Sequence, residues 1–473
     1  MNDKIIKLIK SFCFFLILLI IYNMLNTIFL LKRWDGITSM QHFYSQKKNS
    51  IDVIFLGSST SGTNFNMETL YREYGIAGYN LWSSGQPLAN TYYYLKEALK
   101  YQTPKLFVLE MGSVHTESFG GPHPVINTQG LKFSIDFIKN ITVTTIPYEW
   151  HHLLFGMSTF HTRFKELTKY DFQQFPWNDN SNDKGNFSYI RNYVPLDTSD
   201  VSAIKEIQNI SSKNEKYLNA IIDLCKTKNI PILLVACPRN DKTFLQPYFN
   251  YISDFSERKN IPFINFNLLN EDLKLTTSDT RDGAHHNIKG AKKITLYLGK
   301  YIKENYNIPD RRNTGNDYES WEINAHVMEN KYLHNIYDID EYISFLKDIK
   351  RNIYIVKANM SNSTEYYNTI SKYLSELSAN TLFKNTSDNE IVFIQNQDLT
   401  NESITISSEG SLKIYKSGSL IIHNDSTGIF FIVYDTYTDE IADIAFLPEN
   451  DFYKIQHLLN SKADVIRFNF EYM

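Results

Sequence analysis

Cysteine, glycine and proline are scarce in this chain. Its 473 residues include 3 cysteines, 19 glycines and 13 prolines. Collagen-like and proline-rich architectures need far more glycine and proline, so both are excluded. Cys13, Cys225 and Cys237 cannot build a disulfide framework, and none of them stands in a CxxC or Cys/His ligand spacing. We therefore predict no metal site. Cys225 and Cys237 are expected to be small buried core residues, although they could pair in an oxidising compartment.

An excess of charge of either sign is also missing. The net charge is −4, with 21% charged and 42% hydrophobic residues. A slightly negative net charge does not favour the binding of polyanions, so no nucleic-acid partner is predicted. The hydrophobic share is that of an ordinary globular protein, which excludes wholesale disorder, and the length predicts two or three folded units. No cofactor is predicted.

A long uncharged run is present near the N-terminus, over residues 11–31. At ~1.5 Å per residue a helix of this length spans a ~30 Å hydrocarbon core. The run is too long for the core of a signal peptide, and no small-residue cleavage site follows it. Lys4, Lys7 and Lys10 precede it and favour a cytoplasmic N-terminus. We predict that residues 1–34 form a cytoplasmic tip and a single-pass anchor in the cell membrane, with the rest extracytoplasmic.

Short apolar runs alternate with helical patterns over residues 50–307. Strands are expected at 53–56, 79–82, 105–110, 230–236 and 261–266, and helices at 66–74, 87–101, 203–228 and 289–305. This α/β alternation predicts a parallel sheet with helices on both faces. Residues 114–200 interrupt it and are rich in histidine and aromatic residues, so we expect an insertion that forms a lid or faces the substrate.

A different pattern follows a polar stretch at residues 308–320, which we interpret as a linker. Residues 321–473 are expected to form a smaller α/β or β-rich module. Its helices are predicted at 338–349 and 364–377, its strands at 353–356 and 390–394, and further β-rich stretches over 404–446.

Three separate places carry residues suited to acyl chemistry. Ser59 follows the first strand in Gly-Ser-Ser, where a hydroxyl can be exposed and its own N–H can face a developing oxyanion. Gly85 follows the second strand and lets its N–H approach a bound oxygen. His285 could act as a proton shuttle, and Asp282, three residues earlier, could fix its tautomer. Each signal alone is weak, because such loops are usually helix caps or turns.

The order of these residues resembles that of the SGNH (GDSL-type) hydrolase superfamily, which has a flavodoxin-like parallel sheet. The resemblance covers about residues 50–307. It implies that Ser59 is the nucleophile, His285 the general base and Asp282 its orienting group. The backbone N–H groups of Ser59 and Gly85 would form part of the oxyanion hole.

Two positions depart from that superfamily pattern. Its usual third-strand Asn is missing from Leu109-Glu-Met-Gly-Ser113, and Asn80, Ser84 and Ser113 are candidate replacements. Ser58 replaces the Asp of the GDSL motif, which resembles the cell-envelope branch with the DltD-like and alginate-acetylation proteins. That resemblance implies a cell-surface glycan or a teichoic-acid-like polymer as substrate and a membrane-bound O-acyltransferase as partner.

The segment from Phe160 to Phe172 also resembles membrane-anchored members of that branch, so His161 and Arg163 are expected to face the substrate, unless they merely cap a helix. In the C-terminal region, residues 342–394 and 428–446 resemble the ILEI/PANDER fold, either in permuted order or as two partial copies. This resemblance implies a carbohydrate-binding module or a spacer. The residues leave acyl transfer and hydrolysis undecided. The alternatives are a carbohydrate esterase and a weakly active accessory protein that binds polymer and docks to a transferase.

Overall fold

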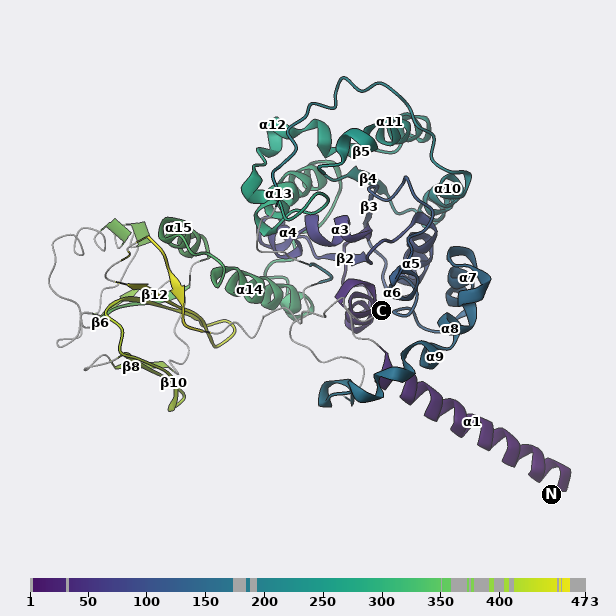
Figure 1. The fold of residues 1–473 in the computed structure, drawn as a ribbon, viewed down its shortest axis with the longest axis horizontal. Helices are drawn as coiled ribbons and strands as arrows, with labels where there is room; N and C mark the ends of the chain where they lie inside the picture. The colour runs from purple at the N-terminus through teal and green to yellow at the C-terminus, as the bar shows by residue number, and fades with distance from the viewer. Residues whose placement is uncertain are drawn as a thin grey trace. The chain divides into compact units, whose positions relative to one another are not determined.

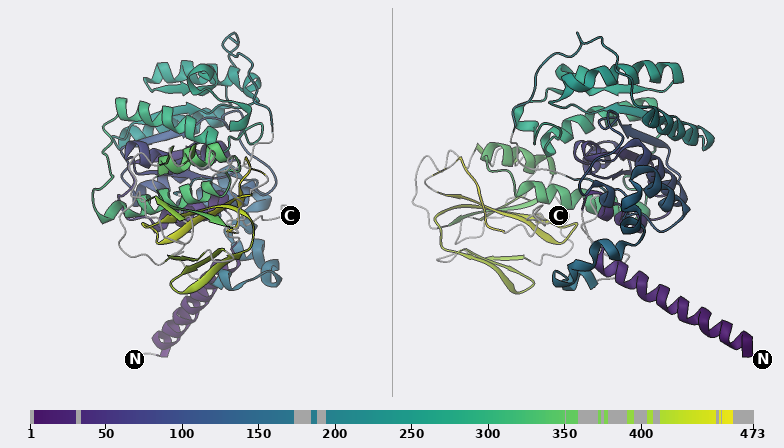
Figure 2. Two further views of the ribbon diagram at one scale, coloured as in Figure 1. Left: turned by 90° about the vertical axis from the view of Figure 1, so that its left-hand side faces the viewer. Right: turned by 45° about the vertical axis from the view of Figure 1, so that its right-hand side comes forward.

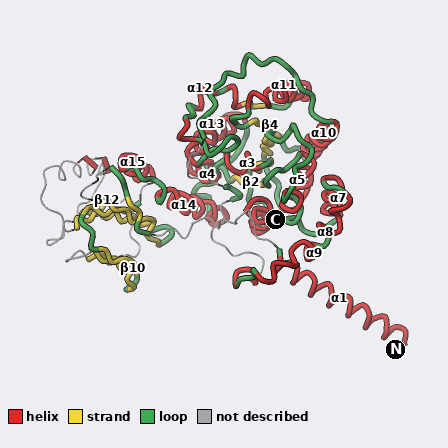
Figure 3. Tube along the Cα trace, in the orientation of Figure 1, coloured by secondary structure: helices red, strands yellow, loops and turns green. Residues whose placement is uncertain are grey.

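The computed structural model divides the chain into two compact units, Met1–Glu322 and Ile323–Met473 (Figure 1). It describes residues 3–30, 34–172, 184–187, 194–349, 351–358, 372–373, 376–377, 391–394, 404–407, 412–448, 451 and 453–459. Helices and strands alternate through much of the first unit, whereas strands prevail in the second (Figure 3).

A five-stranded parallel sheet organises the first unit. Its strands are β1 (Val53–Gly57), β2 (Gly78–Trp82), β3 (Leu106–Glu110), β4 (Ile232–Ala236) and β5 (Phe263–Asn265). They lie in the order β2-β1-β3-β4-β5, and all four pairings are parallel. This is the flavodoxin-like order, so the predicted fold class is confirmed. The order reverses beside β1, where ligand sites of such sheets form at the carboxyl ends of the strands.

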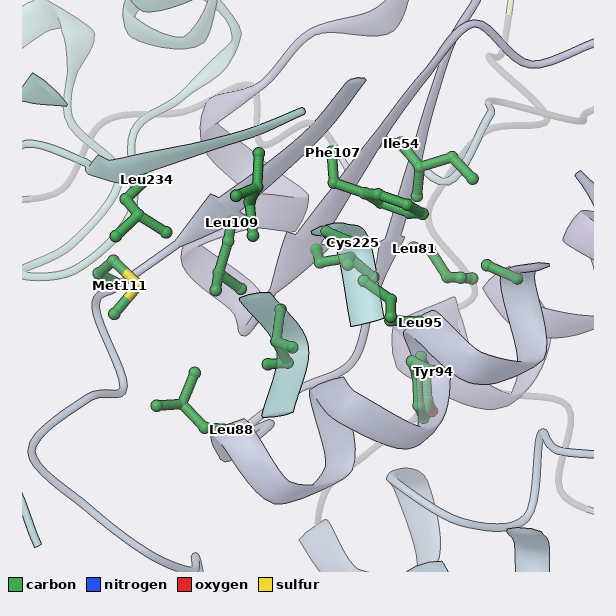
Figure 4. Close-up of a cluster of buried hydrophobic side chains, with 14 of the residues drawn as sticks. Ile54, Leu81, Leu88, Tyr94, Leu95, Phe107, Leu109, Met111, Cys225 and Leu234 are labelled. Atoms are coloured by element: carbon green, nitrogen blue, oxygen red, sulfur yellow. The ribbon is translucent and has the colours of Figure 1, made fainter. Parts of the chain in front are cut away.

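Helices cover both faces of this sheet because apolar side chains point from each strand in both directions. Ile54 and Leu56 face one core and Val53 and Phe55 the other. Figure 4 shows the first core, in which side chains of β1, β2, β3 and β4 meet those of the covering helices. The first core is covered by α5 (Leu88–Tyr101), α10 (Ser212–Thr227) and α11 (Lys242–Lys259), and the second by α4 (Met67–Tyr74) and α13 (Ile288–Asn305).

Two of the helices that cover the sheet differ from the sequence expectations. α10 begins at Ser212 rather than near residue 203, because the Ser211 hydroxyl accepts a hydrogen bond from the N–H of Asn214 and caps the helix there. α11 was not expected. Pro247 lies inside it and interrupts the pattern by which helices are recognised. Cys225 and Cys237 are free thiols, and both are buried.

An apolar helix, α1 (Asp3–Phe29), precedes the sheet and is long and apolar enough to cross a membrane. Two further views show it projecting from the first unit at the end opposite to α11 (Figure 2). Between α1 and β1 lie η1 (Trp34–Thr38) and α2 (Ser39–Ser45). The described part of the insertion contains short helices: α6 (His123–Ile126), α7 (Ile135–Thr144), η2 (Pro147–Glu149), α8 (Trp150–Leu154), α9 (Gly156–Phe160), η3 (His161–Lys165) and η4 (Lys169–Phe172).

The second unit holds antiparallel strands, which confirms a β-rich C-terminal module. One sheet has the order β13-β12-β11-β6-β7 and the other β10-β9-β8. The first comprises β6 (Asn352–Ala358), β7 (Ile391–Ile394), β11 (Gly428–Asp435), β12 (Glu440–Pro448) and β13 (Gln456–His457), and the second β8 (Ile404–Ser407), β9 (Leu412–Lys416) and β10 (Ser419–Asn424).

Two helices accompany these strands, α14 (Glu319–Leu333), which begins in the first unit, and α15 (Ile339–Ile349). α15 packs on one face of the larger sheet, and apolar residues of β9 pack on the other. Most of the helix predicted at 364–377 lies outside the described residues.

Candidate active site

Ser59 stands where the chain leaves the centre of the sheet. The buried strand β1 ends at Gly57, and Ser59 is the first residue of α3 (Ser59–Asn64), which packs against β1, β2 and α13. The Thr63 hydroxyl donates to the Ser59 carbonyl and reinforces this short turn. The Ser59 side chain therefore begins at the carboxyl edge of the sheet, beside the point where the strand order reverses.

His285 and Asp282 lie on the loop that leads into α13. The Asn287 side chain caps that helix by accepting from the N–H groups of Lys289 and Gly290. His285 Nδ1 lies 2.8 Å and 3.0 Å from the two carboxylate oxygens of Asp282. Its Nε2 lies 2.8 Å from the Ser59 hydroxyl oxygen, 226 positions away in sequence. The structure thus brings together the three side chains that the sequence singled out, in one continuous hydrogen-bonded row.

The Asp282 carboxylate is held in its charged form. Partial burial raises its pKa, but hydrogen bonds from the His285 ring and from the N–H groups of Ala284 and His285 outweigh burial and hold the pKa at about 2. A charged acceptor beside Nδ1 keeps the proton on that nitrogen. Nε2 is then left with a lone pair that faces the Ser59 hydroxyl, the arrangement that general-base activation requires.

The N–H groups of Ser59 and Gly85 are candidate oxyanion donors. Neither has a hydrogen-bond acceptor within the described ranges of the chain. Gly85 has a φ of +57°, a left-handed conformation that side chains rarely adopt. A Cβ at this position would also lie 2.7 Å from His123 Nδ1, so both backbone and space require glycine here.

Asn127 and His123, two residues of the insertion, hold the turn that contains Gly85. Neither was predicted from the sequence. Asn127 donates to the Gly85 carbonyl at 2.9 Å and accepts from the Ser83 hydroxyl at 2.5 Å. His123 Nδ1 lies 3.0 Å from the Ser84 carbonyl oxygen. No sequence motif links these positions to Gly85. Only the fold shows that α6 lies against this turn.

Glu110 stands near the place of the missing third-strand Asn and is fully buried. Its Oε1 accepts from the N–H of Gly112 at 2.8 Å, so it is turned back onto its own loop. Burial raises the pKa of Glu110 to about 7, against the opposing charge of Arg239. Arg239 forms an ion pair with Asp241 at 2.7 Å and also reaches the Thr60 hydroxyl at 3.4 Å. A network of ionisable side chains therefore lies beside α3, the helix that begins at Ser59.

The other predicted residues are placed as follows. Both amide atoms of Asn80 bond to Ser61, and the Ser113 hydroxyl donates to the Gln86 carbonyl. These two side chains are thus engaged within the protein. Arg163 donates to the carbonyls of Phe29 and Leu30, at the end of α1, and pairs with Asp171. His161 is exposed, with Nδ1 3.0 Å from the Ser158 carbonyl. No hydrogen bond among the described residues joins Arg163, His161 or Asn80 to Ser59 or His285.

No three His, Cys, Asp or Glu side chains in the described part of the chain converge where a metal ion could bind. We therefore assign no metal ligands. The row formed by Asp282, His285 and Ser59 can polarise a hydroxyl and accept its proton without one.

Solved structures include proteins to which this chain is similar. No protein-family model matches the sequence, and no curated protein matches it. Among solved structures, the chain is similar to a Bacteroides fragilis protein provisionally described as an acylhydrolase. The two share 12% sequence identity with a TM-score of 0.28, over 58% of this chain and 96% of the other.

Proposed function

We propose that this protein is a membrane-anchored serine acyl-transfer enzyme of the SGNH type, which acts on a cell-surface glycan or a teichoic-acid-like polymer. The observation that carries the proposal is the hydrogen-bonded row from Asp282 through His285 to Ser59. Structural histidines and carboxylates often pair, but a pair that also ends on a helix-start serine at the carboxyl edge of a parallel sheet fits an acyl-transfer site.

The proposed reaction has two steps. The Ser59 oxygen attacks the carbonyl carbon of an ester while His285 Nε2 takes the hydroxyl proton. The tetrahedral adduct places its negative oxygen near the N–H groups of Ser59 and Gly85, and its collapse breaks the ester bond as His285 protonates the leaving alcohol. In the second step an acceptor hydroxyl attacks the acyl-serine, His285 takes its proton, and the Ser59 oxygen leaves and is reprotonated. A sugar acceptor yields O-acylation, and water yields deacylation.

Ser59→Ala tests the nucleophile directly. Full-length protein in detergent is treated with a fluorophosphonate probe and, separately, with a p-nitrophenyl acyl ester, with and without an acceptor oligosaccharide. We expect probe labelling and ester turnover in the wild type and neither in Ser59→Ala. Ser58→Ala is the matched control, since it removes a buried hydroxyl one position away, and it should keep both signals. Labelling that persists in Ser59→Ala would refute the assignment.

The products separate the remaining alternatives. Acylated oligosaccharide indicates transfer, and free acid alone indicates a carbohydrate esterase. Polymer binding by a chain that neither labels nor turns over ester would indicate the accessory role instead.

A further inference from the structure

We infer that residues 146–172, here called the collar, lie on the outer surface of the bilayer that α1 crosses; this inference rests on α1 being the proposed membrane anchor. The collar comprises η2, α8, α9, η3 and η4. It presents five large apolar side chains to solvent, each 58–77% exposed: Ile146, Tyr148, Phe155, Phe164 and Phe172. A run of this length seldom leaves so many exposed without a partner.

The collar is joined to the end of α1. Gly156 packs so closely on Asn26 that a Cβ on the glycine would lie 2.5 Å from the Asn26 side-chain oxygen. Phe160 is buried with Leu30 and Ile37 in one small core. Arg163 donates to the last carbonyls of α1, and η3 and η4 also contact that helix. Figures 1 and 2 show α9 beside this end of α1.

The position of these contacts along α1 indicates how deep the collar lies in the bilayer. If the uncharged run of residues 11–31 fills the hydrocarbon core, Asn26 lies five residues from its outer end, or ~7 Å along the helix axis. Amphipathic segments that lie in the interface bury their apolar side ~5–10 Å deep. Along α1, exposed side chains end at Leu25, just before the collar begins to cover the helix. A bilayer around α1 would therefore meet the collar at interfacial depth.

The collar also carries the polar groups that suit the headgroup region. Exposed histidine and lysine side chains are interspersed with its aromatic residues, namely His151, His152, His161 and Lys165. Aromatic and basic side chains are typical of the boundary between hydrocarbon and water. We therefore infer that lipid, rather than a second copy of the chain, covers the apolar side chains of the collar. The contacts with the proposed anchor place the collar in the bilayer whether or not another protein is present.

Spin-label accessibility in the full chain tests this. The protein is reconstituted in nanodiscs of phosphatidylcholine and phosphatidylglycerol. Phe155→Cys, Phe164→Cys and Phe172→Cys are labelled singly in a Cys13→Ser background, in which the remaining cysteines are buried. Phe244→Cys is the matched control, because Phe244 is equally exposed (59%) but lies on α11. In a separate sample of the protein without substitutions, a label on Cys13 reports whether α1 lies in lipid.

We expect labels in the collar to be relaxed more by oxygen than by a water-soluble nickel chelate, as at Cys13 but less strongly, and the Phe244 label to show the reverse. Collar labels that behave like the Phe244 label, with Cys13 in lipid, would overturn the inference alone. A Cys13 label outside lipid would overturn the anchor and with it the proposed location. Collar labels shielded from both agents, or broadened by a neighbouring label, would show that protein covers this surface and would also overturn the inference.

Discussion

At the scale of single residues, the candidate site depends on a charge that the fold maintains. The pKa of Asp282 is held at about 2, so its carboxylate is ionised at any physiological pH. The residue also accepts two backbone hydrogen bonds through Oδ1, which shape the loop. Its electrostatic and its structural contributions can therefore be separated by one isosteric change.

Asp282→Asn should keep the loop and lose the charge. An amide oxygen can still accept the backbone N–H groups, but it no longer stabilises a proton on His285 Nδ1. We expect kcat/KM for ester turnover to fall by roughly 10²–10⁴ with little change in thermal stability. Asp200→Asn is the control. Asp200 also accepts a hydrogen bond from the N–H two residues further along, but it is exposed and does not belong to the row of Asp282, His285 and Ser59. Equal activity in Asp282→Asn and wild type would contradict the role given to Asp282.

His286 should make the fold sensitive to acid. Burial lowers the pKa of His286 to about 4. The unfolded chain takes up this proton near pH 6.5 and the folded protein only near pH 4, so stability falls as pH drops between these values. The full effect is about 3 kcal/mol. Urea unfolding at several pH values should show a shallower loss in His286→Asn than in wild type. Parallel pH profiles would show that His286 does not titrate in this way.

At the scale of elements, the short helix α3 is positioned by close packing on β2. A Cβ on Gly62 would lie 2.2 Å from the Trp82 ring, and the Trp82 ring N–H donates to the Gly185 carbonyl. The ring therefore has little room to move away, and a side chain at position 62 would displace α3 and Ser59 with it.

Gly62→Ala should lower both stability and activity. Overpacking of a close contact costs roughly 1–3 kcal/mol, and a displaced α3 would lengthen the bond between Ser59 and His285. Thermal unfolding and ester turnover measure the two effects. Gly120→Ala serves as control, because nothing lies within 4 Å of a Cβ at that position. The packing argument fails if both variants behave alike.

How much could be predicted from sequence also differs between elements. The apolar runs predicted β1, β2, β3 and β4 because buried parallel strands are continuous and short. Helix α11 was not predicted because Pro247 interrupts the helical pattern of the sequence. Packing of its apolar side chains on the sheet stabilises the helix despite the proline. Ser59, His285 and Asp282 were found because they sit at fixed places relative to strands. His123 and Asn127 belong to an insertion whose course only the fold determines. The hydrogen bonds from Arg163 to the end of α1 also depend on the fold and could not be predicted from the sequence.

At the scale of the whole molecule, the segment that follows the apolar helix α1 is closely connected to the parallel sheet. Ser39 donates to the Trp82 carbonyl at 3.0 Å, and a Cβ on Gly36 would lie 2.7 Å from that of Ser83. The segment that follows α1 thus packs directly on the turn that carries Gly85.

Under the proposed function, a flexible spacer after α1 should change where the protein acylates polymer without changing its chemistry. The variant carries about 40 Gly/Ser residues inserted after Leu31, together with Gly156→Leu and Arg163→Ala, which break the contacts between the collar and α1. The spacer would then add ~35 Å of r.m.s. reach. We expect unchanged turnover of a soluble ester, because Ser59, His285 and Asp282 all follow the insertion, but acylation of surface polymer farther from the membrane. Cells that express either form are compared by locating acyl groups along isolated chains. Lost ester turnover would instead show that the native connection shapes the site.

Gly36, which packs against Ser83, comes only seven residues after the end of α1, so the proposed anchor is joined to the sheet by a short stretch of chain. Under the proposed function, a polymer could be decorated only while its growing portion still passes close to the cell surface. The acylation pattern of a polymer would then be fixed during its export, because a chain that has moved outward is no longer within reach of the site.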